Sequence, residues 1–205
     1  MTSAPPSRSR WLRLGHLELS DLLVETFSVL LGVLLALAIN AWVQARQTQH
    51  KLAEAQASIR EELIADRKRI VISANYYHHL NEAIEAALKT AQPPQFCDRL
   101  PEWRGLITPL FVRAAYDTAA SGGIFAEMDF EATRRIASLY AELNRYEAFS
   151  GKVEDWMGQN TAVNNGAGFN LSLCHGFSTD LEHSALKVQD DLDAWLGPLP
   201  AASKP

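Results

Sequence analysis

One run of 17 residues, 27–43, carries no charge and reads FSVLLGVLLALAINAWV. Three apolar residues at 22–24 extend it to 22 residues, interrupted only by Glu25 and Thr26. At about 1.5 Å per residue such a helix is roughly 33 Å long, which matches a hydrocarbon core of about 30 Å. Trp42 lies where an interfacial aromatic residue is expected. The run predicts a transmembrane anchor over residues 21–43, in contact with the lipid bilayer.

Two alternatives to the anchor are a cleaved signal peptide and a buried helix of a soluble protein. A signal peptide needs small residues after a short apolar region, whereas Ala36 and Ala38 lie inside the apolar run. A buried helix rarely needs an uncharged run of this length. The length of the run therefore favours a membrane-spanning signal anchor.

The orientation of the anchor does not follow from the basic residues, because three precede the span and three follow it closely. These residues are Arg8, Arg10 and Arg13, then Arg46, Lys51 and Arg60. The segment before the span is short, and the long segment after it can be translocated largely regardless of its charge. Both cysteines also follow the span. A pair of cysteines can form a disulfide in an oxidising compartment, which favours an extracytoplasmic position for this segment. We expect residues 1–20 to form a cytoplasmic tail, partly disordered, and residues 44–198 an extracytoplasmic domain.

The chain after the span has helical patterns throughout. Residues 41–90 contain no proline and no glycine, so the helix is expected to continue until Pro93 and Pro94 end it. An apolar stripe at helical spacing follows this stalk: Leu52, Ile59, Leu63, Ile70, Tyr77, Ile84 and Leu88. The charged residues 61–62 and 67–69 are expected mostly on its other faces.

Three further helices are expected, at 108–120, from Asp129 onward, and at 179–196, with a loop at 164–168. No segment alternates apolar and polar residues strongly enough to require a sheet. The predicted fold is mostly α. Its N-terminal transmembrane helix continues into a long stalk helix, which packs with a C-terminal antiparallel helical bundle. A disordered tail is expected at 199–205.

Several segments together carry a resemblance to a known family. They are 25–26, 32–37, Asn40 and Trp42 in the span, Ile59 and 61–63 in the stalk, and 115–119 and 128–130 further on. The chain resembles a bacterial family of small single-pass membrane proteins with a glycine-containing span and a helical domain. The resemblance implies a bacterial inner-membrane protein with its C-terminal domain in the periplasm. It implies no activity.

Four residues at spacing four share one face of the predicted span. Ser28, Gly32 and Ala36 are small, and Asn40 can form a hydrogen bond. Small residues let two membrane helices approach closely, and an asparagine in lipid favours a hydrogen-bonding partner. The face therefore predicts a homo-oligomer or a partner membrane protein. The alternative is a monomeric anchor with Asn40 hydrated near the boundary.

Cys97 and Cys174 are the only cysteines. A disulfide between them would link the loop after the stalk to the segment before the last helix. Two buried thiols are the first alternative. A metal site recruiting His175, with His183 or Asp98, is the second, although no C-x-x-C or H-E-x-x-H spacing supports it.

Known catalytic and nucleotide-binding motifs are not found in the sequence. The glycines at 122–123 and 166–168 lack the rest of a phosphate-binding motif. The formal net charge of −5 argues against a nucleic-acid partner. We expect no cofactor and a non-enzymatic protein that acts through helix–helix or protein–protein contacts. The alternatives are a membrane-tethered enzyme, with a site among Asp117, Glu127, Asp129 or the histidines, and an accessory subunit of an envelope or transport complex.

Overall fold

A computed structural model describes residues 15–163 and 170–197, with side chains at 22–159 and 170–197. The chain divides into two compact units, one ending at Lys51 and one beginning at Leu52. The predicted tail at 199–205, the loop at 164–168 and residues 1–14 of the N-terminal tail lie outside the described residues.

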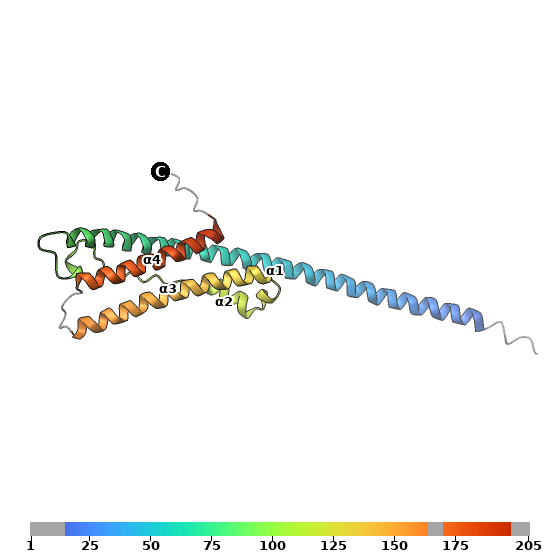
Figure 1. Cartoon of the computed structure of the whole chain (residues 1–205). Helices are drawn as coiled ribbons and strands as arrows, with labels where there is room; N and C mark the ends of the chain where they lie inside the picture. The colour runs from blue at the N-terminus through green and yellow to red at the C-terminus, as the bar shows by residue number, and fades with distance from the viewer. Residues whose placement is uncertain (1–14, 164–169, 198–205) are drawn as a thin grey trace, which may run out of the picture. The chain divides into compact units, whose positions relative to one another are not determined.

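The described part of the first unit is a single helix. It is the beginning of α1, which extends from Gly15 to Leu88 (Figure 1). Every residue from 22 to 46 is exposed, including the whole uncharged run. By length and composition, α1 is the one helix among the described residues that could cross a membrane.

The second unit is a helical bundle made of the rest of α1 with α3 (Phe130–Val163) and α4 (Leu171–Leu196) (Figure 1). Its core includes the expected stalk stripe from Ile59 to Ile84, which is fully buried. Helix α3 contributes residues such as Ile136 and Leu143, and α4 contributes Leu181 and Leu192. No strand forms in the described residues, where the single isolated β-bridge joins Phe96 to Asn170. The predicted mostly α fold, with a long N-terminal helix packed against a C-terminal bundle, is confirmed.

The helix expected at 108–120 begins later than predicted. Helix α2 is Ala114–Ser121, and the part of this segment before it is not helical. We call residues 104–113 the strap. Pro109 cannot donate a backbone hydrogen bond, and side chains of α1 bind several backbone groups of the strap instead. Leu106 and Phe111 therefore pack against the core without forming a helix, whereas Leu110 and Val112 are exposed.

The last helix begins earlier than predicted, at Leu171 instead of residue 179. Asn170 caps it, since its Oδ1 accepts a hydrogen bond from the backbone N–H of Ser172 at 2.9 Å. The predicted cap at Asp129 is present as well. Its Oδ2 accepts from the N–H of Ala132 at 3.0 Å, and α3 begins at the next residue.

Candidate functional site

The first candidate surface is the small-residue face of α1. Ser28, Gly32, Ala36 and Asn40 are all exposed, and a Cβ added at Gly32 would meet no atom within 4 Å. Asn40 makes no hydrogen bond to any described residue, whereas the Thr26 hydroxyl donates to the Leu22 carbonyl at 2.7 Å. The face is therefore open to a partner helix, and its side-chain amide is available to one.

The second candidate is the pair of cysteines, which the structure joins as a disulfide between Cys97 and Cys174. Their Cα atoms are 6.4 Å apart, within the range that disulfides span, and both residues are buried. Cys97 begins the short 3-10 helix η1 (Cys97–Arg99), and Cys174 lies in the first turn of α4. A backbone hydrogen bond from Leu171 to Gln95 lies beside them. The bond thus attaches the start of α4 to the loop that follows α1.

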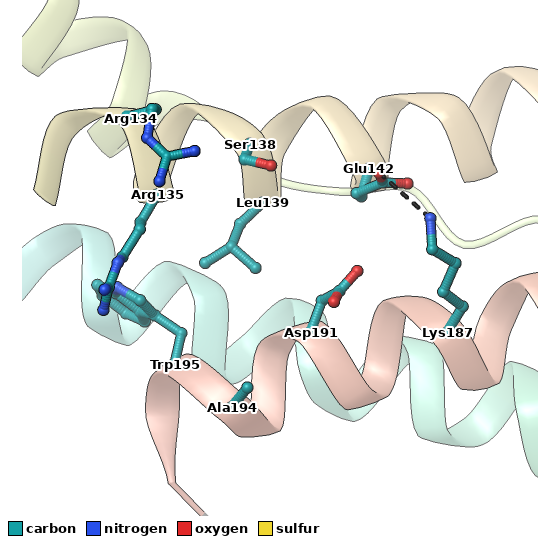
Figure 2. Close-up of a pocket in the computed structure, with 9 residues that line it drawn as sticks. All are labelled: Arg134, Arg135, Ser138, Leu139, Glu142, Lys187, Asp191, Ala194 and Trp195. Atoms are coloured by element: carbon teal, nitrogen blue, oxygen red, sulfur yellow. Dashed lines mark hydrogen bonds and ion pairs between the residues drawn. The ribbon is translucent and has the colours of Figure 1, made fainter. Parts of the chain in front are cut away.

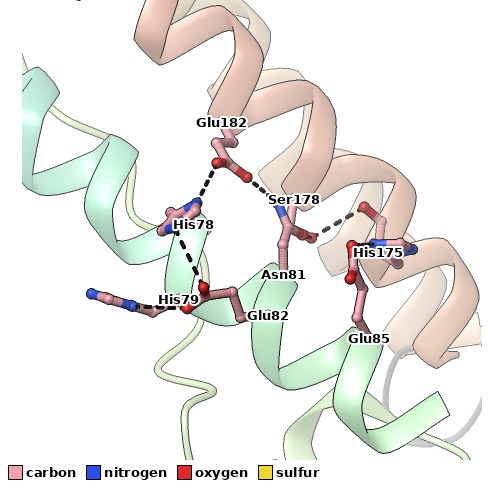
Figure 3. A network of polar contacts seen from close by, with 8 residues as sticks. All are labelled: His78, His79, Asn81, Glu82, Glu85, His175, Ser178 and Glu182. Atoms are coloured by element: carbon pink, nitrogen blue, oxygen red, sulfur yellow. Dashed lines mark hydrogen bonds and ion pairs between the residues drawn. The ribbon is translucent and has the colours of Figure 1, made fainter. Parts of the chain in front are cut away.

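A polar seam between α1 and α4 was not predicted from the sequence (Figure 3). Glu182 of α4 accepts hydrogen bonds from His78 at 2.8 Å and from the side-chain amide of Asn81 at 2.5 Å. Ser178, which is buried, donates to Asn81. The hydrogen bond with Glu182 raises the pKa of His78, and the nearby Glu82 adds to the increase. The signal available in the sequence was a pair of histidines, His78 and His79, followed at helical spacing by Glu82 and Glu85.

The face of α1 toward the strap carries a second polar network. Tyr77 is buried, and its hydroxyl accepts from the N–H of Ile107 at 3.0 Å and donates to the carbonyl of the same residue at 3.2 Å. Asp66 accepts from the N–H of Val112 at 3.2 Å. Glu62 accepts from the N–H of Ala115 at 2.8 Å and from the hydroxyl of Tyr140. These side chains supply the hydrogen bonds that a helix would have supplied internally.

Burial changes the acid–base properties of this network. Desolvation raises the pKa of the Asp66 carboxyl, despite its hydrogen bonds to Val112 and Arg69. Desolvation and the contact with Glu62 raise the pKa of Tyr140, so this phenol remains a hydrogen-bond donor at neutral pH. Both groups hold α1, the strap and α3 together, and neither opens onto the hollows described next.

A third feature is a groove along the contact between α3 and α4. Two adjoining hollows of about 490 and 430 Å³ form it, and both include Glu142 and Lys187 (Figure 2). Its floor is apolar, and its walls are charged. The floor consists of Leu139, Tyr146, Phe149, Val188, Ala194 and Trp195. The guanidinium of Arg60 from α1 lies 6.0 Å from the centre of the Trp195 ring.

The residues considered for catalysis or metal binding are not gathered into one cleft. Asp129 is a helix cap, Asp117 lies 3.9 Å from Arg113 on the surface, and neither lines the groove. His183 lines the second hollow of the groove. His175 instead lies 3.9 Å from Glu85, at the polar seam between α1 and α4. The described residues contain no cluster of three histidine, cysteine or acidic side chains that could hold a metal ion.

Comparisons with protein-family models, with curated proteins and with solved structures find no match for this chain. The resemblance to a bacterial membrane family therefore stays a prediction.

Proposed function

We propose that this protein is a non-enzymatic, single-pass membrane protein of the bacterial inner membrane, with its helical domain in the periplasm. It acts through contacts between helices: the anchor face of Ser28, Gly32, Ala36 and Asn40 binds a second copy or a partner membrane helix. The helical bundle presents its surfaces outside the membrane. Neither role needs a cofactor or a nucleic acid.

The observation that carries the proposal is the exposure of the whole apolar run of α1. A monomer in water would expose Leu34, Ile39 and their neighbours at more than half of their surface. Soluble proteins rarely expose continuous apolar surface of this extent, so lipid is the natural cover. The disulfide supports the periplasmic side, because such bonds persist in oxidising compartments.

Self-association of the anchor is tested with a reporter of transmembrane-helix dimerisation in the bacterial inner membrane. Replacing both Gly32 and Ala36 with leucine should lower the signal at least fivefold, because the added side chains keep the helix backbones apart. The matched control is Val33→Leu with Leu37→Val, which changes residues off this face and conserves composition. An unchanged signal in the Gly32→Leu/Ala36→Leu variant would refute the anchor contact.

Orientation is tested with fusions to the C-terminus of the full chain. Alkaline phosphatase is active only after export, and green fluorescent protein folds only when it stays in the cytoplasm. We expect phosphatase activity without fluorescence. The opposite pattern would reject the periplasmic placement while leaving the anchor contact open to its own test.

A further inference from the structure

The C-terminal end of the apolar run carries one charged residue at the level where lipid headgroups would lie. Residues 44–48 read QARQT, and Arg46 is the single charge among them. At about 1.5 Å per residue, Arg46 lies roughly 4.5 Å past Val43 along the helix axis. The headgroup layer extends about 5–7 Å beyond each side of the hydrocarbon core. Lys51, the next lysine or arginine, lies roughly 12 Å past Val43 and therefore beyond that layer.

The side chain of Arg46 lies over the ring of Trp42, one turn earlier in α1. Both residues are exposed, and the guanidinium carbon is 5.5 Å from the ring centre. Helical side chains point toward the N-terminus of their helix, so Arg46 extends back toward the apolar run. The cation–π contact restricts a flexible side chain and leaves the guanidinium N–H groups free to donate. Trp42 therefore positions the cation at the boundary between hydrocarbon and headgroups.

No carboxylate neutralises this cation within the described part of the chain. Arg46 takes part in no ion pair there, whereas Arg67 of the bundle pairs with Asp193 at 2.8 Å. At the edge of a layer of low dielectric constant, an unpaired cation interacts strongly with an anion. A guanidinium binds phosphate oxygens through two parallel N–H bonds. Arg46 thus has the chemistry and the position to bind a phosphate of the headgroup layer.

We propose that Trp42 and Arg46 form a binding site for the phosphodiester group of an anionic phospholipid. The phosphate accepts hydrogen bonds from Arg46, and an acyl chain packs along the apolar surface of α1. Phosphatidylglycerol is preferred over phosphatidylcholine, because the choline ammonium of the latter competes with Arg46 for the phosphate. At about 100° per residue the pair lies roughly 60–100° from the centre of the anchor face, so lipid and a partner helix can bind together. The inference rests on the proposed insertion of α1 into lipid and requires neither the anchor contact nor the orientation.

The test uses the full chain in nanodiscs of phosphatidylcholine with a minority of phosphatidylglycerol of the same acyl chains. Native mass spectrometry counts the lipids that remain bound after release into detergent. Replacing Arg46 with glutamine should lower the ratio of bound phosphatidylglycerol to phosphatidylcholine about fivefold, the effect of one arginine at an anionic headgroup. Arg46→Lys should retain part of the preference, since it keeps the charge without the bidentate geometry. Trp42→Leu should lower the ratio about twofold, because the cation–π contact is lost.

The matched control is Lys51→Gln, which removes the same charge beyond the headgroup layer and should leave the ratio unchanged. Every variant is made in a background that lacks the basic residues before the span: Arg8→Gln, Arg10→Gln and Arg13→Gln. Equal ratios for this background and its Arg46→Gln variant would overturn the proposal, as would an equal loss in Lys51→Gln.

Two further measurements identify the source of the phosphate and separate this inference from the proposed function. An excess of soluble glycerol phosphate, compared with sodium chloride at the same ionic strength, should not displace the bound lipid; displacement would reject a lipid site. All variants should resist alkaline carbonate extraction from membranes as the wild type does. A chain that stays in the membrane without a preference for phosphatidylglycerol contradicts the lipid site alone. A wild-type chain that is extracted contradicts the proposed anchor and the lipid site together.

Discussion

The two units of this chain bury their side chains in opposite ways, although α1 contributes to both. In the first unit, leucines such as Leu34 are more than half exposed. In the second, Leu63 is fully buried, and so is the carboxylate of Asp66. A single helix thus changes from apolar and exposed to amphipathic, with polar groups inside the bundle. This contrast supports the proposal that lipid covers the apolar run of α1, whereas the described part of the second unit excludes water by its own packing.

The first prediction compares one leucine of each unit. Leu63→Ala should lower the free energy of unfolding of the bundle by about 3 kcal/mol, because it leaves a cavity in a packed core. Leu34→Ala should leave that free energy unchanged within about 0.5 kcal/mol, since the side chain contacts no core. Chemical denaturation of the full chain in mild detergent, followed by tyrosine and tryptophan fluorescence, measures both. Equal effects would show that the two units do not differ in this way.

The disulfide should stabilise the second unit alone. Its cysteines are 77 residues apart, and the chain-entropy model gives about 4.5 kcal/mol for a loop of that length. The Cys97→Ser/Cys174→Ser double variant should therefore unfold at a markedly lower denaturant concentration, and a reductant should destabilise the wild type to the same extent. The variant should remain in the membrane fraction to the same extent as the wild type, because the disulfide lies outside the first unit. A wild-type protein insensitive to reductant would contradict this role.

The hydrogen bonds of the strap network should contribute less to the free energy of unfolding than the Leu63 side chain or the disulfide. Tyr140→Phe removes the donor to Glu62, and the remaining partly buried carboxylate loses one hydrogen bond. We expect a loss of about 1–2 kcal/mol in the free energy of unfolding. Tyr116→Phe is the matched control, because no hydrogen bond of the Tyr116 hydroxyl occurs among the described residues. Equal losses in the two variants would show that the hydroxyl of Tyr140 is not a stabilising contact.

The smallest effect concerns pH at the seam between α1 and α4. Glu182 raises the pKa of His78 above its ordinary value of about 6.5, so protonated His78 is favoured in the folded state. Its stabilising contribution is complete below about pH 6.5 and is lost as pH rises through the higher folded pKa. The unfolding midpoint should fall slightly between about pH 6 and pH 8.5, and by less in His78→Gln. Identical pH profiles would exclude this role.

Sequence alone predicted the elements whose signals are local. The absence of proline and glycine before Pro93 indicated the long α1, which ends at Leu88, and Asp129 indicated the start of α3. Asn170 caps α4 in the structure, and the helix includes Gly176, which lies before the predicted start at residue 179. The helix continues through this glycine because its neighbours, from Cys174 to Ser178, pack on α1 and η1.

Features that depend on distant residues were not predictable in this way. The strap requires Tyr77 of α1 to bind the backbone of Ile107, which lies 30 residues further on. Arg67 was expected on an outer face, yet it is buried because Asp193 and the carbonyl of Gly197 bind its guanidinium. The groove likewise depends on the register of α3 against α4, which no periodicity within one helix specifies.

Above all, we propose that lipid covers the apolar run of α1 while water surrounds the bundle. Leu34 and Ile72 are similarly exposed in the structure, at 55% and 62%. The most direct measurement is therefore labelling of Leu34→Cys and Ile72→Cys by a membrane-impermeant maleimide in intact cells with a permeabilised outer membrane. We predict rapid labelling at position 72 and none at position 34, even after lysis without detergent. Equal labelling at both positions would contradict the proposal.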